Sequence, residues 1–429
     1  MKNLILFSIL ILLTLEERKI KLIYEHFRHG ARFPESNLNS KNNDLFNIHH
    51  DLIGEITEVG LRMHYIEGYE IREKYLNIYN STNIYVQSTN SERTIQSANA
   101  HLLGMYPSIL KNLSDEQVKN SYPPNKFDDD IKEEMNELIK KLENRPLPYN
   151  MQIIPVHILS PLKQKYSSTF CPYMKYFWNE NKKKYKKNFD NIYKETEEKY
   201  GKYFKKFFNN DSFTFENFDV LESYCDHYIS DYLFNINYFD KLYITGISLQ
   251  EFYNQCKKIN ELKIFKNYFT EDKYIIYGNS PLIRDMISFF NNKDKNNSPK
   301  YKILSGHDST VGSLQSYFKY VFKNEITKNN IYPELATTMI IELYEENNKE
   351  YIEYKINDEI LMNIEYEKFN EMIQKNLISD EELDNFCNTK NNTVLYYIFL
   401  VIFLLIIIIL AYLIYKTYID YKIEMSNSV

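Results

Sequence analysis

The order of apolar and polar positions predicts strands and helices that alternate along the first hundred residues. Residues 21–27 read Lys-Leu-Ile-Tyr-Glu-His-Phe, and alternate side chains of this run share a face, as in a strand. Residues 55–79 repeat apolar side chains at spacings of three and four, which predicts a helix. Residues 83–87 predict a second strand, and residues 88–100 predict a turn followed by a helix. This alternation is typical of an α/β fold.

The same alternation returns in the second half of the chain. Residues 274–277 predict a strand, and a helix is expected from Leu282. Residues 302–304 predict the next strand, and residues 338–344 and 350–354 predict a final pair of strands. The two halves together predict one α/β domain with an insertion in its middle.

The middle of the chain, residues 108–242, lacks this alternation. Residues 118–145 are rich in charge, and residues 177–208 repeat aromatic and apolar side chains at helical spacing, which predicts one long helix. Several lysines stand between these apolar positions and favour a solvated helix face over a role in steering anionic substrates. These lysines are Lys182, Lys183, Lys184, Lys186 and Lys187.

Apolar runs at the two ends predict a protein that enters a membrane. Residues 4–13 have the length of a signal-peptide core, which predicts a signal peptide at residues 1–16. Residues 394–415 hold no charged side chain and as a helix would span roughly 33 Å, enough for the hydrocarbon core. Lysines after this span and acidic residues before it predict a cytosolic tail at residues 416–429. The body is then expected in a lumen or outside the cell, as in a single-pass type I membrane protein of the secretory pathway.

Composition narrows the function classes. The 429 residues carry a formal net charge of −6, which gives no support for nucleic-acid binding. The four cysteines lie too far apart for paired zinc ligands. Asn-x-Ser/Thr triplets on the expected lumenal side are candidate glycosylation sites, although such triplets also arise by chance in an Asn-rich chain. These asparagines are Asn80, Asn112, Asn210 and Asn391.

Three short stretches carry candidate chemistry. The first is Arg28-His29-Gly30-Ala31-Arg32-Phe33-Pro34, which follows the first predicted strand directly. Gly30 allows a sharp turn and a close approach of a ligand to the backbone. Two guanidiniums beside one imidazole are costly unless an anion lies between them, and the planar fork of Arg matches phosphate. Ligands of open α/β sheets bind where strands end, so this stretch predicts a phosphate site.

The other two stretches also stand at predicted strand ends. The second is Ser88-Thr89-Asn90-Ser91-Glu92-Arg93-Thr94, in which Arg93 lies in the first turn of a predicted helix. A helix start offers backbone donors to an anion, and Arg93 adds a guanidinium to them. The third is Ser305-Gly306-His307-Asp308-Ser309-Thr310-Val311, which continues directly from the strand at residues 302–304.

The three stretches, in this order, resemble the histidine acid phosphatases, the second branch of the histidine phosphatase superfamily. The resemblance extends over about residues 21–387, and Asn90 stands where the family pattern has Asp. It implies a three-layer α/β fold with a mostly parallel sheet flanked by helices, an inserted α-helical cap and one C-terminal transmembrane helix. The implied phosphatase domain is residues 17–387, with its α/β core at about 19–110 and 243–360 and its cap at about 111–242.

The resemblance also implies a reaction. His29 would attack the phosphorus of a phosphate monoester as nucleophile and become a phosphohistidine, and Asp308 would protonate the leaving group. No cofactor and no metal are implied, because arginines supply the charge that a metal would. An acid that must start protonated works best below neutral pH, so an acidic optimum is expected. The implied ligands of the phosphoryl oxygens are Arg28, Arg32, Arg93 and His307.

Cysteines and topology extend the resemblance. The family places a long-range disulfide where Cys171 and Cys387 stand, and an oxidising compartment would permit it. The usual partner of Cys225, in the stretch near Ala336, is absent, so a pairing of Cys225 with Cys256 stays open. The order of signal, lumenal body, single span and short tail resembles membrane-anchored acid phosphatases of the lysosomal and prostatic type. The lysosome or vacuole and the cell surface both stay open as locations, and so does a homodimer.

Two other functions stand beside the acid phosphatase. One is a non-catalytic surface glycoprotein on the same fold that binds phosphorylated ligands or partners, and the intact set of candidate site residues argues against it. The other is a phosphatase specialised for phytate or for lysophosphatidate, which a wide basic pocket or an apolar groove would indicate. Substrate choice is expected to lie in the cap, which the sequence does not decode.

Overall fold

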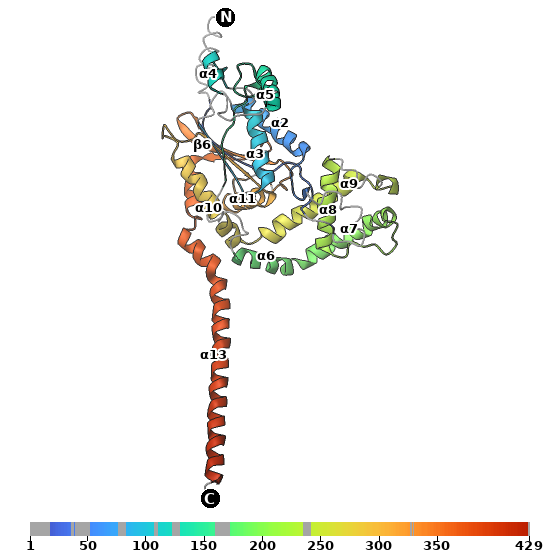
Figure 1. The fold of residues 1–429 in the computed structure, drawn as a ribbon, viewed down its shortest axis with the longest axis vertical. Coiled ribbons are helices and arrows are strands. Elements are labelled where there is room, and N and C mark those ends of the chain that lie inside the picture. Colours follow the sequence, from blue (N-terminus) through green and yellow to red (C-terminus); the bar gives the residue numbers. More distant parts are fainter. Residues whose placement is uncertain are drawn as a thin grey trace.

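A computed structural model describes residues 18–35, 38, 52–75, 83–106, 110–121, 129–158, 172–234, 242–326, 328 and 330–427. Within these residues the centre is a seven-stranded sheet with helices around it (Figure 1). The strands are β1 Lys19–Arg28, β2 Ile84–Ser88, β3 Val156–Ile158, β4 Tyr301–Gly306, β5 Thr338–Glu346, β6 Lys349–Ile356 and β7 Glu359–Glu365. The α-helices are α2 Glu58–Tyr75, α3 Glu92–Met105, α4 Asp115–Asn120, α5 Asp129–Leu142, α6 Pro172–Lys184, α7 Lys186–Phe207, α8 Phe218–Phe234, α9 Leu249–Leu262, α10 Asp272–Asn291, α11 Asp308–Val321, α12 Tyr366–Gln374 and α13 Asp380–Asn427. Shorter helical turns are Pro148–Asn150, Tyr243–Thr245 and Lys263–Tyr268.

The sheet is mixed, in the order β3-β2-β4-β1-β5-β6-β7. The four strands from β3 to β1 are parallel neighbours, whereas β5, β6 and β7 join through antiparallel pairings. Because β6 is antiparallel to β5, it runs in the direction of β1, so five of the seven described strands point the same way. The predicted α/β class, with a largely parallel sheet between helices, is confirmed.

Strand β1 is buried on both faces, and its alternate residues enter two different cores. Leu22 and Tyr24 pack with residues of α10 and α11, in a core that also takes in β5, β6 and β7. Ile23 and Phe27 pack with residues of α2 and α3. The prediction that alternate residues share a face is therefore confirmed, and the sheet is the middle of three layers.

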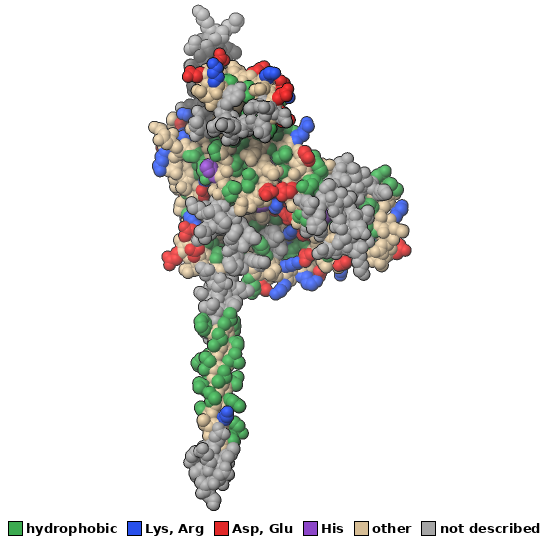
Figure 2. Space-filling view, in the orientation of Figure 1, with side chains coloured by type: hydrophobic (Ala, Val, Ile, Leu, Met, Phe, Trp, Pro, Cys, Tyr) green, Lys and Arg blue, Asp and Glu red, His purple; other side chains and the backbone are tan. Residues whose placement is uncertain are grey.

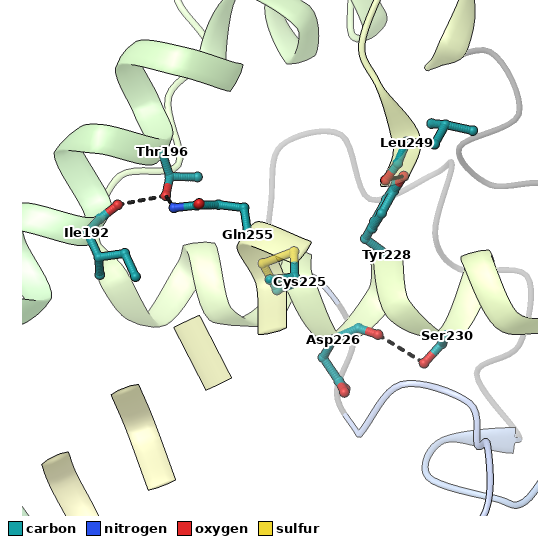
Figure 3. The surroundings of a disulfide bond; sticks show 9 residues. Ile192, Thr196, Cys225, Asp226, Tyr228, Ser230, Leu249 and Gln255 are labelled. Carbon is teal, nitrogen blue, oxygen red and sulfur yellow. Dashed lines mark hydrogen bonds between the residues drawn. A yellow bond between two sulfur atoms is a disulfide. The ribbon is translucent and has the colours of Figure 1, made fainter. Parts of the chain in front are cut away.

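Helices α7, α8 and α9 form a second unit beside the sheet, with an apolar core of their own (Figure 1). Phe204 of α7, Tyr224 of α8 and Phe252 of α9 belong to this core. A disulfide between Cys225 and Cys256 joins α8 to α9, with 5.1 Å between the two Cα atoms (Figure 3). The pairing that the sequence leaves open for Cys225 is therefore the one with Cys256.

Hydrogen bonds near this disulfide tie the three helices together (Figure 3). Gln255 Nε2 of α9 donates to Thr196 Oγ1 of α7 at 2.8 Å, and Tyr228 OH of α8 donates to the carbonyl of Leu249 at 2.8 Å. Cys387 is disulfide-bonded as well. Its expected partner, Cys171, lies outside the described residues, so the Cys171–Cys387 bridge stays a prediction.

The strand predicted at residues 274–277 was wrong, because these residues lie inside helix α10. The short apolar run Tyr-Ile-Ile-Tyr fits a strand and a buried helix equally well, and Pro281 suggested that a new element begins there. In the structure Pro281 lies within the helix, and apolar residues on both sides of it join the core that covers the sheet. The packing of these apolar residues in the core therefore makes residues 274–277 helical.

Two further expectations need correction. The helix predicted over residues 177–208 is two helices, α6 and α7, which meet at Tyr185. Residues 111–242, predicted as a helical cap, also contribute strand β3 to the edge of the sheet. A strand of three residues is too short to produce a recognisable period of two. Strand β7 was missed although Asn357 and Asp358, both with positive φ, form the kind of two-residue turn that joins hairpin strands.

Helix α13 extends away from the body of the molecule (Figure 1). Its segment Tyr397–Ile419 has a mean hydropathy of 3.3 and is, among the described residues, the one helix long and apolar enough to cross a membrane by length and composition. The large apolar side chains of this segment are exposed (Figure 2). The span predicted at residues 394–415 coincides with most of it, and the signal peptide predicted at residues 1–16 lies outside the described residues.

The predicted glycosylation sites lie in different surroundings. Asn112 is exposed and accepts a hydrogen bond from Asn150 Nδ2 at 3.0 Å. Asn210 is partly exposed, and its Oδ1 accepts a hydrogen bond from the amide of Ser212 at 3.0 Å. Asn391 lies in α13, and Asn80 lies outside the described residues. Glycosylation of these four residues stays a prediction.

Candidate active site

The three candidate stretches meet because the strands before them are neighbours in the sheet. β4 lies between β1 and β2 and is parallel to both, so that Arg28 at the end of β1 stands beside Gly306 at the end of β4. His29 follows β1, His307 follows β4, and Arg93 lies in the first turn of α3, just after β2. The predicted site residues therefore lie at one edge of the sheet, where open α/β sheets bind ligands.

His29 is almost completely buried, with 2% of its surface exposed. Its Nδ1 lies 2.9 Å from the carbonyl oxygen of Gly30, and because a carbonyl only accepts, Nδ1 carries the proton of this hydrogen bond. The pKa of His29 is held well below its ordinary value, first by burial and then by the positive charges of Arg28 and Arg32. The imidazole is therefore neutral, with an unprotonated Nε2 that can act as a nucleophile.

Gly30 is required by packing rather than by a ligand. A Cβ on Gly30 would lie 2.3 Å from the carbonyl oxygen of Gly60 in α2, and a Cβ on Gly60 would lie 2.1 Å from the carbonyl oxygen of Ala31. The loop after β1 and helix α2 thus touch through their backbones. The close approach that the structure shows at Gly30 is that of α2, and a contact of its backbone with a ligand stays a prediction.

Each arginine of the site makes an ion pair with a carboxylate. The pairs are Arg28–Asp308 at 3.1 Å, Arg32–Asp226 at 2.9 and 3.2 Å, and Arg93–Glu35 at 2.7 Å. The Nε atom of each of these arginines is buried and has no hydrogen-bond partner among the described residues. A buried donor without a partner costs free energy, so the three guanidiniums are suited to receive an anion.

His307 lies next to His29, with 5.5 Å between the centroids of the two rings. Its Nε2 is 3.0 Å from Thr89 Oγ1, a hydrogen bond that fixes the orientation of the ring. Burial, followed by the positive charge of Arg93, lowers the pKa of His307 to about 4. The ring is therefore neutral near neutral pH and can offer one N–H group to a ligand.

Asp308 is the first residue of helix α11, and 31% of its side chain is exposed. Burial opposes its ionisation, but the charges of Arg28 and Lys263 outweigh burial and hold the pKa of Asp308 below its ordinary value. Asp308 is thus ionised at neutral pH in this structure. An anion bound to Arg28 would offset part of that positive charge and so favour the protonated carboxyl.

A small cleft of about 20 Å³ opens beside Arg28 and Arg32. Arg28 donates to Tyr332 OH at 3.2 Å and to the carbonyl of Pro333 at 2.8 Å, which places the segment after α11 on one wall. In Figure 2 acidic and basic side chains gather where the unit of α7, α8 and α9 meets the body around the sheet. Further lining residues are Asp226, Tyr253, Lys257 and Glu334.

Sequence reasoning missed Glu35, Asp226 and Tyr332. Glu35 directly follows the first motif, so its charge beside two arginines was a usable signal. Asp226 lies 194 residues from Arg32 along the chain, and Tyr332 lies 304 residues from Arg28. No local sequence pattern predicts contacts between residues so far apart in the chain. The packing of α8 and of the segment after α11 creates these contacts.

The chain is similar in sequence to known proteins. The profile of the Histidine phosphatase superfamily (branch 2) matches residues 26–357. A stretch of 101 residues is 32% identical to lysosomal acid phosphatase of Xenopus laevis and covers 21% of this chain and 22% of that protein, so the match spans about a fifth of the relative.

Two solved structures show the same fold. The phytase from Citrobacter braakii has a TM-score of 0.53 at 10% identity, and the match covers 84% of this chain and 98% of that one. Hafnia alvei phytase in complex with myo-inositol hexakis sulphate has a TM-score of 0.53 at 10% identity, with 85% and 98% covered. At such identities the likeness shows the fold alone.

A neutral histidine and three arginines, brought together at the ends of neighbouring strands, make a candidate anion site in an α/β protein. The family profile covers most of the chain, and the chain therefore belongs to the histidine phosphatase superfamily, branch 2. Membership of this family supports a hydrolase of the phosphatase type.

Proposed function

We propose that this protein is an acid phosphatase that hydrolyses phosphate monoesters through a phosphohistidine intermediate. The observation that carries the proposal is the environment of His29, a buried neutral imidazole with an unprotonated Nε2 beside three guanidiniums. A protein that only bound phosphate would need the arginines, but it would have no use for a histidine held in one tautomer.

In the first step the phosphate of the substrate binds to the three arginines, and His307 adds a hydrogen bond. The lone pair of His29 Nε2 attacks phosphorus while the bond from phosphorus to the leaving oxygen breaks. The carboxyl proton of Asp308 moves to that oxygen. This step produces a free alcohol, a phosphohistidine and the carboxylate form of Asp308.

In the second step a water molecule attacks the phosphorus of the phosphohistidine, and the carboxylate of Asp308 accepts a proton from it. The bond between phosphorus and His29 Nε2 breaks, its electron pair returns to the nitrogen, and inorganic phosphate leaves. In both steps the arginines neutralise the phosphoryl oxygens, which is a role that metal ions have in other phosphoryl-transfer sites.

The directions of the pKa shifts support activity at acid pH. His29 must be neutral to attack, and a pKa well below the ordinary value keeps it neutral in mildly acidic solution. Asp308 must begin protonated, and because its pKa is lowered in this structure, protonation requires acid together with a bound phosphate. The rate is therefore expected to rise as the pH falls from about 8 toward about 5.

The proposed setting is the secretory pathway. Residues 1–16 would act as the signal peptide, α13 as the single membrane anchor and residues 416–429 as a cytosolic tail. The catalytic body would then lie in a lysosomal or vacuolar lumen or at the cell surface. The match to a lysosomal acid phosphatase and the apolar segment of α13 support this setting.

The test is hydrolysis of 4-nitrophenyl phosphate by the full-length protein in detergent, from about pH 4 to about pH 9 and with a chelator present. We expect activity that resists the chelator, peaks at acid pH and falls more than about a thousandfold in kcat for His29→Ala. His157→Ala is the matched control, because His157 is an exposed histidine on β3 that stacks on Tyr85. Folded protein without activity would favour the non-catalytic anion-binding alternative.

A further inference from the structure

The three arginines of the site are matched by three carboxylates, and the three pairs are not equivalent. Asp308 opens helix α11, and Asp226 receives two hydrogen bonds from Arg32. Glu35 receives one hydrogen bond from Arg93 and makes a longer contact of 3.6 Å with Arg32. The guanidiniums are therefore already neutralised one for one. A phosphate that binds all three of them through their free Nε–H groups therefore competes with these carboxylates for the positive charge.

Glu35 is the carboxylate that can withdraw. Of its side chain 52% is exposed, compared with 24% for Asp226 and 31% for Asp308. Glu35 follows Pro34 on the loop after β1, outside any helix or strand. Asp226, in contrast, also accepts a hydrogen bond from the backbone amide of Glu35 at 2.8 Å, which adds to its anchoring. A half-exposed ion pair is weak enough for an incoming anion to break it.

On the side of Arg28 and Arg32, the described residues that line the cleft offer little to a second phosphate. Lys257 lines the cleft, but it is ion-paired with Glu334. Asp226 and Glu334 contribute negative charge to the same walls. Within the part of the chain that the structure describes, the lining residues thus provide no cation beyond the arginines that lacks a carboxylate partner.

We propose that Glu35 is a specificity residue. Its carboxylate pairs with Arg93 until one phosphate of the substrate displaces it. The displaced carboxylate then repels any further phosphate on the same substrate. The site therefore selects esters that carry a single phosphate over inositol polyphosphates. This inference rests on the proposed phosphatase function and adds the substrate class. A displaced carboxylate stays tethered next to Pro34, so its charge still acts over the Debye length of about 8 Å at physiological salt.

The test compares the full-length wild type with Glu35→Gln, which removes the charge, and with Glu35→Asp, which keeps it. Asp219→Asn serves as the matched control, because Asp219 is an exposed carboxylate of α8 that pairs with Lys182 and does not line the cleft. One readout is the Kd of inorganic phosphate, measured by calorimetry. The other is kcat and KM for 4-nitrophenyl phosphate and for inositol hexakisphosphate at one acid pH.

Glu35→Gln is expected to bind inorganic phosphate about two- to fivefold more tightly than the wild type. This factor corresponds to the free energy that an exposed ion pair contributes. For 4-nitrophenyl phosphate, KM should fall by a similar factor while kcat changes little. In Glu35→Gln, kcat/KM for inositol hexakisphosphate should rise by a larger factor than kcat/KM for 4-nitrophenyl phosphate. The reason is that several phosphates of the same substrate are then no longer repelled by the carboxylate. Glu35→Asp should keep the wild-type preference, and Asp219→Asn should leave both readouts unchanged.

Each contrary outcome points to a different failure. Equal phosphate affinity in wild type and Glu35→Gln would overturn the role of Glu35, and so would a Glu35→Asp variant that behaves like Glu35→Gln. Phosphate binding without hydrolysis by the wild type would overturn the proposed phosphatase function, while the affinities would still test Glu35. A wild type that binds no phosphate would overturn both.

Discussion

Two clusters of basic and acidic side chains lie at opposite ends of strand β1, and they are built differently. At the N-terminal end Arg18 binds Glu342 and Glu353 at 2.6 and 2.8 Å. Lys355 binds the same two carboxylates at 2.5 and 2.7 Å. Both glutamates are almost wholly buried. Each of these four charges thus has two partners of opposite sign, and the network is closed.

The cluster at the C-terminal end of β1 is open. Its arginines hold one principal carboxylate each, and every one of them keeps a buried Nε–H group without a partner among the described residues. In a closed network the charges satisfy one another, whereas a binding site keeps donors in reserve and tolerates the cost in stability. Substitutions in the closed cluster should therefore change stability, and substitutions in the open one should change chemistry.

The largest effect that would sharpen this contrast is expected at Asp308. Asp308→Asn keeps the shape of the side chain but removes the proton donor, so kcat for alkyl phosphates should fall by about 10² to 10⁴. The loss should be smaller for 4-nitrophenyl phosphate, because nitrophenolate leaves readily without a proton. Steady-state kinetics with both substrates measures the difference. Equal losses for the two substrates would argue against Asp308 as the general acid.

At Glu353 of the closed cluster, we expect a substitution to lower the stability of the protein and to leave kcat unchanged. Glu353→Gln leaves Arg18 and Lys355 with Glu342 alone, and breaking a buried ion pair costs about 3 to 5 kcal/mol. We expect about 3 kcal/mol in the free energy of unfolding, because Arg18 is one-third exposed and one carboxylate remains. Denaturant unfolding measures this loss, and kcat of the folded variant should equal that of the wild type. A large fall in kcat would remove the distinction between the clusters.

The loss of stability in Glu353→Gln should depend on pH, and the pKa of Glu353 determines the direction. Burial alone would raise the pKa of Glu353, but hydrogen bonds from Arg18 and Lys355 hold it below its ordinary value. Its stabilisation is therefore complete above the ordinary glutamate pKa and disappears as the pH falls through the lowered value. The difference between wild type and Glu353→Gln should shrink below about pH 4. At the open end, Arg32 outweighs burial and lowers the pKa of Asp226 to about 2, so this pair persists at the proposed working pH.

The open cluster was predictable from the sequence to the extent that it is local. Arg28 ends strand β1, and His29 and Arg32 follow it. The alternation of side chains predicts this strand and its two faces, so its end places the three residues together. The same reasoning applies to His307, which follows β4 directly, and to Arg93, which lies in the first turn of the helix after β2. What brings the three stretches together is the neighbouring positions of their strands in the sheet. No local pattern predicts that strand order, and the resemblance to a known family implied only a mostly parallel sheet.

The closed cluster and the partners of the arginines were not predictable in this way. Glu342 interrupts the apolar run of β5, and a lone glutamate is seldom buried unless it is paired, yet Glu342 is buried. Its burial depends on Arg18 and Lys355, which come from two other segments. Asp226 likewise reaches Arg32 only because α8 packs against the loop after β1. Such contacts arise from tertiary structure and leave no local period.

The smallest effect concerns the link between the open cluster and the helical unit. Cys225, which is bonded to Cys256, directly precedes Asp226 on α8, so the disulfide helps to hold the carboxylate that pairs with Arg32. Replacing both cysteines by alanine frees a loop with a sequence separation of 31 residues, and such losses amount to about 2 to 4 kcal/mol. We expect about 2 kcal/mol, because α7, α8 and α9 keep their apolar core and the hydrogen bond of Tyr228.

This substitution also tests whether the two clusters are independent. If the helical unit supports only the open cluster, KM for 4-nitrophenyl phosphate should rise a few-fold in the double-alanine variant while kcat stays the same. The cost of Glu353→Gln should then be identical with and without the disulfide, because distant sites without shared partners are additive within about 0.5 kcal/mol. Thermal and denaturant unfolding of the single and combined variants gives this comparison. A coupling well above that value would mean that the sheet transmits strain from one end of β1 to the other, and the contrast between a closed structural cluster and an open chemical one would no longer hold.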